Sequence, residues 1–302
     1  MAINTGNFGK ALWPGINAWW GQEYNQYETK YDKMFDTFTS RKRFEEDVGT
    51  SMFGIAPQKP EGTPVQYDTA QQGFLTRYNH VTYALGFVIT EEMIEDDLYD
   101  VVGQKNARAL AKSMRVTKEV VGANVYNRAF TSGYNGGDGV VLCSNAHPNV
   151  AGGTWSNTLA TPADLSEASL EQAVIDIMKW TDDRGLPIMV QPTRLIIPVD
   201  LVFDAERILK SVQRVDTANN DINALKSMGR FSDVVSNRYL TDTNAWFIRT
   251  DVNDGMKYFE RKADEFAMDN DFDTSNYKYK AVGRYSFGWS DPRGIYGSPG
   301  SN

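Results

Sequence analysis

The sequence predicts an α+β fold in which a long extended ribbon leads directly into one unusually long helix. Residues 48–90 carry repeated glycines and prolines, which disfavour a helix and favour turns and extended backbone. Apolar residues then recur at helical spacing from residue 91 to residue 130, and an alternating segment lies near the end of the chain. A ribbon of this length covers little of its own apolar face, so we expect it to pack on another copy of the same chain.

The composition is that of a folded chain with a sizeable core. Its 302 residues, 41% of them hydrophobic, suit one complex domain or two interleaved ones. The net charge of -8 argues against a protein that grips nucleic acid by its phosphates. A single cysteine, Cys143, excludes internal disulfides and suits a reducing compartment. No apolar run approaches the roughly 18 residues that span a bilayer, and Met1–Trp20 lacks the apolar core of a signal peptide. We therefore expect no membrane contact.

The first half of the chain divides into an arm at 1–49, the ribbon at 50–90 and the long helix at 91–130. The arm ends in a charged run at 41–47, which is typical of a solvated face. Thr90 stands where the N-cap of the helix belongs. Two apolar faces follow from the spacing: Val81, Tyr83, Leu85, Phe87 and Ile89 on the ribbon, and Ile94, Leu98, Val101, Val102, Ala107, Leu110, Ala111, Met114, Val121, Val125 and Ala129 on the helix.

The second half mixes loops, helices and strands. Gly185 stands where a helix C-terminal cap belongs. Strands dominate from Val234, and the last expected strand runs from Tyr277 to Trp289 with aromatic residues on one face. The elements before them are a glycine-rich loop at 131–165, a helix from Ser166 to Arg184, a buried strand at 188–198, a short helix at about 200–211 and a polar loop at 212–232.

Few residues offer chemistry. His80 lies in the alternating ribbon and is interpreted as a surface or cross-strand residue. Cys143 and His147 lie four residues apart, a spacing that would suit half a metal site or a thiol–imidazole pair. No second cysteine exists and the other histidine is distant, so we interpret this segment as a structural loop held by Asn145 and Pro148.

Two further motifs are incomplete. Asp269, Asp271 and Asp273 have the spacing of a calcium loop, but Thr274 and Lys280 replace the glycine and glutamate that such a loop needs. An acidic turn between strands fits better, with weak cation binding left open. Residues 134–139 (YNGGDG) lack the lysine and hydroxyl of a phosphate-binding loop. We therefore expect no catalytic residue, no cofactor and no metal, and a structural protein rather than an enzyme.

The order of these parts resembles the major capsid protein of tailed bacteriophages, the Hong Kong ninety-seven-like or Johnson fold. That family has an N-terminal arm, an extended loop, a long spine helix, an axial domain and a closing peripheral sheet. The resemblance covers most of the chain from about residue 40. Four segments carry it: 86–97 (GFVITEEMIEDD) at the start of the spine helix, 142–148 (LCSNAHP) in a loop, 192–201 (PTRLIIPVDL) in the axial domain and 277–286 (YKYKAVGRYS) in the last peripheral strand.

The resemblance implies how subunits would meet. The extended loop would lie over the neighbouring subunit's spine helix, and the loop at 212–232 would approach the centre of each capsomer. The implied segments are an N-terminal arm (1–49), an extended β-hairpin loop (50–88), a peripheral domain with the spine helix (89–165), an axial domain (166–250) and C-terminal peripheral strands (251–302). The residues expected at subunit interfaces are Lys59, Tyr67, Arg77, Arg214, Asp216, Asn219, Asn220 and Asp221.

The implied function is an icosahedral shell of hexamers and pentamers that encloses double-stranded DNA without sequence-specific binding. The shell would assemble in the bacterial host cytoplasm and end in the virion. The arm starts at Met1 without the long scaffolding segment of many relatives, so the resemblance implies a separate scaffolding protein or a chain that assembles without cleavage. A portal and a decoration protein are further candidate partners. Some relatives crosslink an extended-loop lysine, and Lys59 is the only lysine of the ribbon, but no partner asparagine or activating glutamate can be matched.

Three other readings stay open at this point. An encapsulin-type nanocompartment would share the fold and enclose cargo enzymes rather than DNA. An α+β hydrolase would need a ligand pocket with perturbed carboxylates. A tail or decoration protein would form rings or trimers rather than closed shells.

Overall fold

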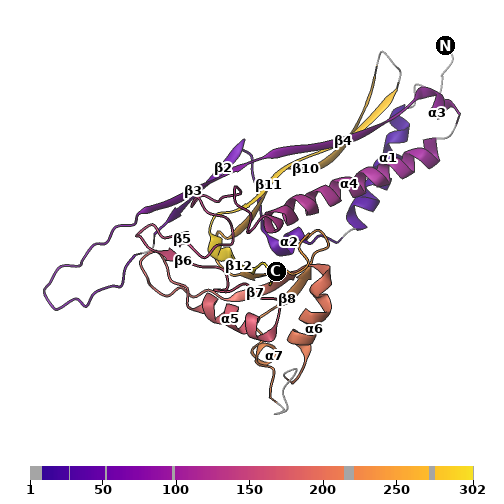
Figure 1. Cartoon of the computed structure of the whole chain (residues 1–302). Coiled ribbons are helices and arrows are strands. Elements are labelled where there is room, and N and C mark those ends of the chain that lie inside the picture. The colour runs from indigo at the N-terminus through magenta and orange to yellow at the C-terminus, as the bar shows by residue number, and fades with distance from the viewer. Residues whose placement is uncertain are drawn as a thin grey trace.

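The computed structural model describes residues 9–26, 28–51, 53–96, 99–213, 221–271 and 276–301. It confirms a mixed helix-and-sheet fold with two separate four-stranded sheets, and a long hairpin loop projects away from the body (Figure 1). The peripheral sheet has the order β1–β10–β11–β4, and the axial sheet has the order β12–β9–β7–β8. The expected spine helix lies along the peripheral sheet.

The peripheral sheet follows the predicted alternation. Its strands are β1 (Asp36–Thr39), β4 (Val81–Ile89), β10 (Met256–Asn270) and β11 (Tyr277–Trp289), with β1 parallel to β10 and the other pairs antiparallel. On β11, Tyr277 and Tyr279 are buried while Lys278 and Lys280 are exposed. On β4, Ile89 is buried against the helix layer, but Val81 and Leu85 remain half exposed, so only the end of this face near the helix enters the core.

The long helix is interrupted near its start. The described helices are α3 (Glu91–Glu95) and α4 (Tyr99–Asn127), where the periodicity predicts one helix over 91–130. Thr90 caps α3 as expected, because its Oγ1 accepts the N–H of Met93 at 3.4 Å. The acidic residues Glu91, Glu92, Glu95 and Asp96 form like-charged pairs four residues apart, which disfavour continuation of the helix.

The predicted stripe of α4 is its core-facing side. Ala107, Leu110, Ala111 and Met114 are buried with Ile89 in one cluster. The same cluster holds Ile16, Trp20, Phe266, Tyr277, Tyr279 and Ala281. The side chains of the expected stripe residues Ile94 and Val101, and the whole of Leu98, lie outside the described residues. Val121 and Val125 are half-buried and pack against a second cluster around Tyr126.

The expected arm contains two helices, α1 (Gly9–Gln26) and α2 (Tyr31–Met34). Helix α1 packs on α4 and buries Ile16 and Trp20, and the Trp20 ring stacks on Phe266 with centroids 5.0 Å apart. The asparagine and glycine content of the arm does not predict α1, because this helix is stabilised by tertiary packing and not by its local sequence. Among helices of the described ranges, none combines the length and apolarity needed to cross a membrane.

The axial body surrounds the second sheet. It consists of β7 (Pro192–Ile197), β8 (Asp233–Ser236), β9 (Trp246–Thr250), β12 (Ile295–Ser298), α5 (Glu167–Met178), the short 3₁₀ turn η2 (Val199–Leu201), α6 (Val202–Lys210) and α7 (Ala224–Met228). The strand near 188–198 and the helix near 200–211 are therefore confirmed. The loop expected at 212–232 contains α7, which Asn223 caps by accepting the N–H of Lys226.

Helix α5 ends earlier than the sequence predicts. Ser166 is its N-cap, but the helix stops at Met178 and not at Arg184. Asp182 Oδ1 accepts the N–H groups of Arg184 and Leu186, each at 2.8 Å, and so builds a tight turn instead. Gly185 has φ +80° in this turn, a conformation that suits glycine, so it serves the turn and not a helix cap.

The chain ends in the axial sheet. The strand expected to be last, β11, is followed by the 3₁₀ turn η3 (Pro292–Gly294) and by β12, which pairs antiparallel with β9. The expected C-terminal segment 251–302 thus contributes β10 and β11 to one sheet and β12 to the other.

The projecting loop is a hairpin with a strand-free tip. Strand β2 (Phe44–Thr50) pairs antiparallel with β3 (Gln72–Asn79), so the pairing begins within the expected arm and not at Val48. Residues 53–70 form no strand, and every one of them is exposed. A second small hairpin, β5 (His147–Pro148) with β6 (Thr154–Trp155), lies near the hairpin base.

A buried ion pair connects the helix layer to the peripheral sheet. Lys118 Nζ on α4 lies 3.1 Å from Asp264 Oδ2 on β10, and their side chains are 3% and 0% exposed. The hydroxyl of Tyr24 on α1 donates to the same oxygen at 2.5 Å. The register of β10 shifts between Glu260 and Glu265, a bulge that turns Asp264 inward.

We predict that Leu110→Asp unfolds or aggregates the subunit. Leu110 is 4% exposed inside the α4 cluster, and an unpaired charge there costs about 4 kcal/mol or more. Ala109→Asp is the matched control, because Ala109 is the exposed neighbour on the same helix. Thermal unfolding and solubility of both variants measure the difference; a soluble Leu110→Asp subunit with normal stability would show that the stripe faces another way.

Candidate assembly interface

The tip of the hairpin loop exposes apolar side chains that its own chain does not cover. Ile55 is 79% exposed and Tyr67 is 96% exposed, and Phe53 and Val65 are also largely exposed. Figure 1 shows this loop reaching far from both sheets. Four large apolar groups on a segment without a core of its own indicate a surface that another molecule covers.

The base of the hairpin is held firmly to the body. Lys257 on β10 pairs with Asp47 on β2, and Ser290 Oγ donates to Asp47 Oδ2 at 2.5 Å. Between the two strands, Arg77 Nε donates to Glu46 Oε1 at 2.7 Å and the guanidinium lies over the Phe44 ring. Register and direction of the loop are therefore fixed at its base.

An arginine in the turn after α5 connects the loop to the axial body. Arg184, in the turn after α5, has Nη1 at 2.5 Å from Asp68 Oδ2, and its Nη2 donates to the carbonyl of Thr69 at 2.5 Å. Asp68 also accepts the N–H groups of Gly54 and Thr69, each at 2.8 Å. These two N–H groups, followed by Arg184, hold the pKa of Asp68 below its usual range. We call this contact the Arg184 latch.

The expected interface residues fall into three groups. Lys59 and Tyr67 are exposed on the loop tip, and Asp221 is exposed beside α7. Arg77 is engaged within its own subunit by Glu46. Arg214, Asp216, Asn219 and Asn220 lie outside the described residues. Nearby, Phe203 on α6 and Ile222 beside α7 are about three-quarters exposed, so the axial end also presents apolar surface.

The hairpin base and the turn after α5 border an open, acidic cavity. Its volume is about 690 Å³, and among its lining residues only Arg293 is a cation. The lining aspartates are Asp47, Asp138, Asp182, Asp183, Asp251, Asp254 and Asp291. Burial raises the pKa of Asp291, and Arg293 partly opposes this. Asp291 nevertheless has a structural role, because its Oδ1 accepts the N–H of Arg293 and caps η3. The raised pKa of Asp291 therefore accompanies a structural role at the start of η3.

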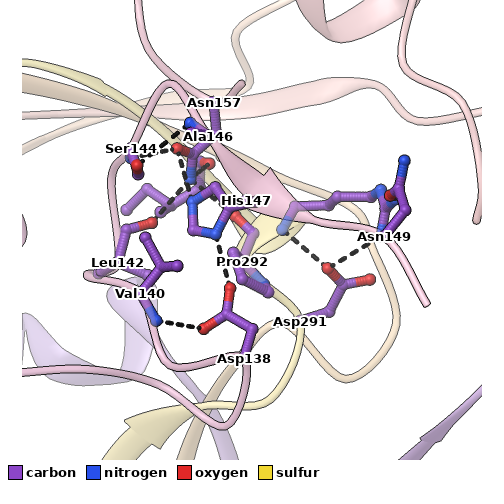
Figure 2. Close-up of polar contacts among 12 residues, drawn as sticks. Asp138, Val140, Leu142, Ser144, Ala146, His147, Asn149, Asn157, Asp291 and Pro292 are labelled. Atoms are coloured by element: carbon purple, nitrogen blue, oxygen red, sulfur yellow. Dashed lines mark hydrogen bonds and ion pairs between the residues drawn. The ribbon is translucent and has the colours of Figure 1, made fainter. Parts of the chain in front are cut away.

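His147 belongs to a buried polar junction (Figure 2). Its Nδ1 lies 2.7 Å from Asp138 Oδ2 and its Nε2 lies 3.1 Å from Asn157 Oδ1. The amide of Asn157 is oriented by its neighbours, since Nδ2 donates to the carbonyls of Leu142, Pro292 and Ile295 and Oδ1 accepts the N–H of Ser144. The junction joins the loop at 138–157 to η3 and β12.

Cys143 takes no part in that junction. Its thiol is buried, and burial raises the pKa of the thiol because it disfavours the thiolate. The His147 ring nitrogens contact Asp138 and Asn157 and not sulfur. The spacing of Cys143 and His147 therefore reflects a packed loop. Nothing in the local sequence around Asp138 or Asn157 marks either residue as a partner of His147, so the sequence alone does not reveal the junction.

The expected acidic turn lies between β10 and β11. Asp269 is opposite Lys278 in the strand pairing, and Asp271 Oδ2 lies 2.6 Å from Lys278 Nζ. Asp273 is outside the described residues. In the described part of the chain, no group of three or more acidic, histidine or cysteine side chains is arranged to hold a metal ion.

Two sheets, a long spine helix and a projecting hairpin with exposed apolar side chains are the architecture of a structural protein rather than of a ligand-binding one. The family profile described as phage capsid protein matches residues 75–298. The chain belongs to this family of phage capsid proteins, which are structural components of the virion. The resemblance to tailed-phage major capsid proteins seen in the sequence is thereby confirmed.

Solved structures show the same fold at low identity. The capsid of an empty GTA particle is 12% identical, with 89% of each chain covered and a TM-score of 0.54. A protein of Mycobacterium phage Patience is 13% identical, with 98% of this chain and 88% of that chain covered and a TM-score of 0.53. A virus-like particle from Pyrococcus furiosus is 9% identical, with 94% and 97% covered and a TM-score of 0.51. No curated protein sequence matches the chain.

We predict that Arg184→Gln frees the loop without unfolding the subunit. The substitution removes two contacts to Asp68 and Thr69, whereas both sheets keep their cores. Limited proteolysis of unassembled subunits near Lys59 should become several-fold faster at a nearly unchanged melting temperature. Arg238→Gln, an exposed arginine remote in sequence from the loop, is the control. Equal cleavage of both variants and the wild type would show that the latch does not restrain the loop.

His80 supplies a pH-dependent prediction. Its ring nitrogens lie 3.0 Å from Ser286 Oγ and 3.1 Å from Ser40 Oγ, so it is a buried cross-strand residue. Burial, followed by Arg284, lowers the pKa of His80 from 6.5, and Glu45 opposes this. Because the pKa of His80 is lower in the folded state, the neutral ring stabilises the fold above pH 6.5. This stabilisation is lost as the pH falls through the folded-state pKa.

The free energy of unfolding of the wild type should therefore fall more steeply than that of His80→Gln as pH drops below about 6.5. Chemical denaturation of both proteins at a series of pH values measures the difference. Parallel pH curves would show that His80 does not change its proton affinity on folding.

Proposed function

We propose that the chain is a major capsid subunit that assembles into hexamers and pentamers of an icosahedral shell enclosing double-stranded DNA. Membership of the phage capsid family supports this proposal. The observation that carries it is the hairpin loop, whose exposed residues 53–70 include Phe53, Ile55, Val65 and Tyr67. Covering these groups removes apolar surface from water, and each fully buried side chain contributes about 1.5–3 kcal/mol.

In this proposal the loop of one subunit lies over the peripheral layer of the next. Firm attachment of the hairpin at Asp47 and Glu46 gives the loop a defined direction, while the exposed tip leaves it free to adapt to its neighbour. Around the capsomer axis, exposed Phe203 and Ile222 would meet other copies. A scaffolding protein, a portal and a decoration protein are the further partners, met during assembly in the host cytoplasm.

A shell that encloses protein cargo is the second candidate. The virus-like particle from Pyrococcus furiosus shares the fold over nearly the whole chain, so the fold alone does not choose between the two candidates. The two candidates differ in content, so nucleic acid extracted from purified shells separates them. Open rings or trimers without closed shells would instead favour a tail or decoration protein.

We predict that Ile55→Ser with Tyr67→Ser weakens assembly and leaves the subunit fold intact. Both side chains are exposed in the single subunit, so their loss changes little until a neighbour covers them. Gln58→Ser with Gln66→Ser is the matched control, at exposed polar positions of the same loop. Light scattering across a concentration series and negative-stain electron microscopy should show shells for the wild type and the control. A wild type that stays monomeric at high concentration, with or without scaffolding protein, would refute the proposed function.

A further inference from the structure

The buried pair between α4 and the peripheral sheet holds an amine against a carboxyl group in a place that solvent does not reach. Lys118 Nζ lies 3.1 Å from Asp264 Oδ2, and the two side chains are 3% and 0% exposed. Three aromatic rings surround the amine with their centres 5.2 to 6.0 Å from Nζ, and they belong to Tyr31, Tyr258 and Tyr285. The packing of the helix on the sheet therefore keeps the two groups together and away from solvent.

The two carboxyl oxygens of Asp264 have different surroundings. Oδ2 faces Lys118 and accepts the hydroxyl proton of Tyr24 at 2.5 Å. Oδ1 is buried, and no hydrogen-bond donor reaches it from the residues that the structure describes. Strand β11 closes over this oxygen, since a Cβ added at Gly283 would lie 1.9 Å from Oδ1. A buried carboxylate oxygen without a donor is unfavourable, so the fold stabilises only one half of the ionised carboxyl group.

This arrangement meets the requirements for a condensation between the two side chains. Burial disfavours both charges, and a proton passed from Nζ to the carboxylate leaves a neutral amine beside a neutral carboxylic acid. The Tyr24 hydroxyl contacts Oδ2, where negative charge develops when the amine attacks the carboxyl carbon. Burial, followed by the hydrogen bond to Asp264, raises the pKa of Tyr24, so this hydroxyl keeps its proton. A contact fixed by the fold also removes the entropic cost of bringing amine and carboxyl group together.

We propose that Lys118 and Asp264 condense to an amide, which links α4 covalently to β10 within one subunit. Nζ bonds to the side-chain carboxyl carbon of Asp264, the bond from that carbon to Oδ1 breaks, and Oδ1 leaves as water with two of the three ammonium protons. One proton stays on the amide nitrogen, and Oδ2 stays as the carbonyl oxygen. One positive and one negative charge disappear together, so the reaction needs neither an oxidant nor a further reactant.

The amide suits its surroundings better than the ion pair does. It contains no charge that must be desolvated, and it lacks the oxygen that has no donor. Reversal requires water to enter a place where both side chains are at most 3% exposed. The link belongs to the single subunit and goes beyond the proposed function, because it forms whatever the subunit assembles into. Lys59 of the loop has no part in it.

The test is the mass of the whole chain, measured after the folded protein has been denatured. The wild type should be lighter than its sequence by the mass of one water. Lys118→Arg keeps the positive charge, but the guanidinium stays protonated and is no nucleophile, so this variant should have its full mass. Lys105→Arg is the matched control, since it makes the same substitution at an exposed position of α4, and it should be lighter by one water like the wild type.

A peptide map of the wild type locates the lost water. Trypsin should fail to cleave after Lys118, and a branched peptide should contain both Lys118 and Asp264. An aspartate followed by glycine can also lose water by closing a succinimide ring, and the chain has such pairs at Asp138 and Asp254. A loss that maps to either of these pairs would overturn the proposal, as would a full-mass wild type after prolonged incubation. The map decides even where Lys118→Arg does not fold.

Tyr24→Phe tests the hydroxyl that contacts the carboxyl group. Freshly synthesised Tyr24→Phe should reach the lighter mass about a hundredfold more slowly than the wild type, because one donor to the developing negative charge is removed. Equal rates would overturn the role of Tyr24 in the reaction. None of these measurements needs an assembled shell, so a full-mass wild type that still forms shells would end this proposal and leave the proposed function in place.

Discussion

The architecture depends on how α4 is fixed to its surroundings by two adjacent buried charges. Lys118 reaches the peripheral sheet through Asp264, and Glu119 accepts the N–H of Lys30 at 2.8 Å at the start of α2. A buried ion pair adds little to the free energy of unfolding, because the cost of desolvating both groups offsets their attraction. A helix in the wrong position, however, would leave one of the buried charges unpaired. The Lys118–Asp264 ion pair therefore selects one position of α4 along the peripheral sheet. Gly283 is part of the same constraint, since a Cβ there would overlap Asp264 Oδ1.

Elements defined by local periodicity could be predicted from the sequence, and elements defined by distant partners could not. The alternation of β11 and the stripe of α4 were readable because each repeats over many consecutive residues. The end of α5 depends on Asp182 folding back on its own turn, and β12 becomes a strand by pairing with β9, about fifty residues earlier. At the candidate site, exposed Lys59 and Tyr67 were foreseeable from loop composition. The Arg184 latch was not, because Arg184 and Asp68 are 116 residues apart in the chain.

The subunit has rigid parts, which are held by buried contacts, and one adaptable part, the loop at residues 53–70. Both sheets, α4 and the His147 junction are built from buried contacts with fixed partners, such as the Asn157 amide and its three carbonyl acceptors. Residues 53–70 have neither strand pairing nor burial. The proposed function needs both properties, because a subunit that meets its neighbours at different angles must keep a rigid body while its contact segment adapts. The Arg184 latch lies between them and ties residues 68 and 69 of the loop to the turn after α5.

Charge is distributed unevenly over the subunit. Negative charge gathers at the cavity between hairpin and axial body, where seven aspartates face one arginine, whereas α4 is free of acidic residues for eighteen positions. A net charge of -8 alone would predict a protein indifferent to nucleic acid. The average conceals an uneven distribution, since every charged residue between Asp100 and Glu119 on α4 is a cation. Net charge governs solubility and long-range repulsion, but exposed charges more than a Debye length of about 8 Å apart are largely screened, so a partner of the subunit meets the local charge and not the average.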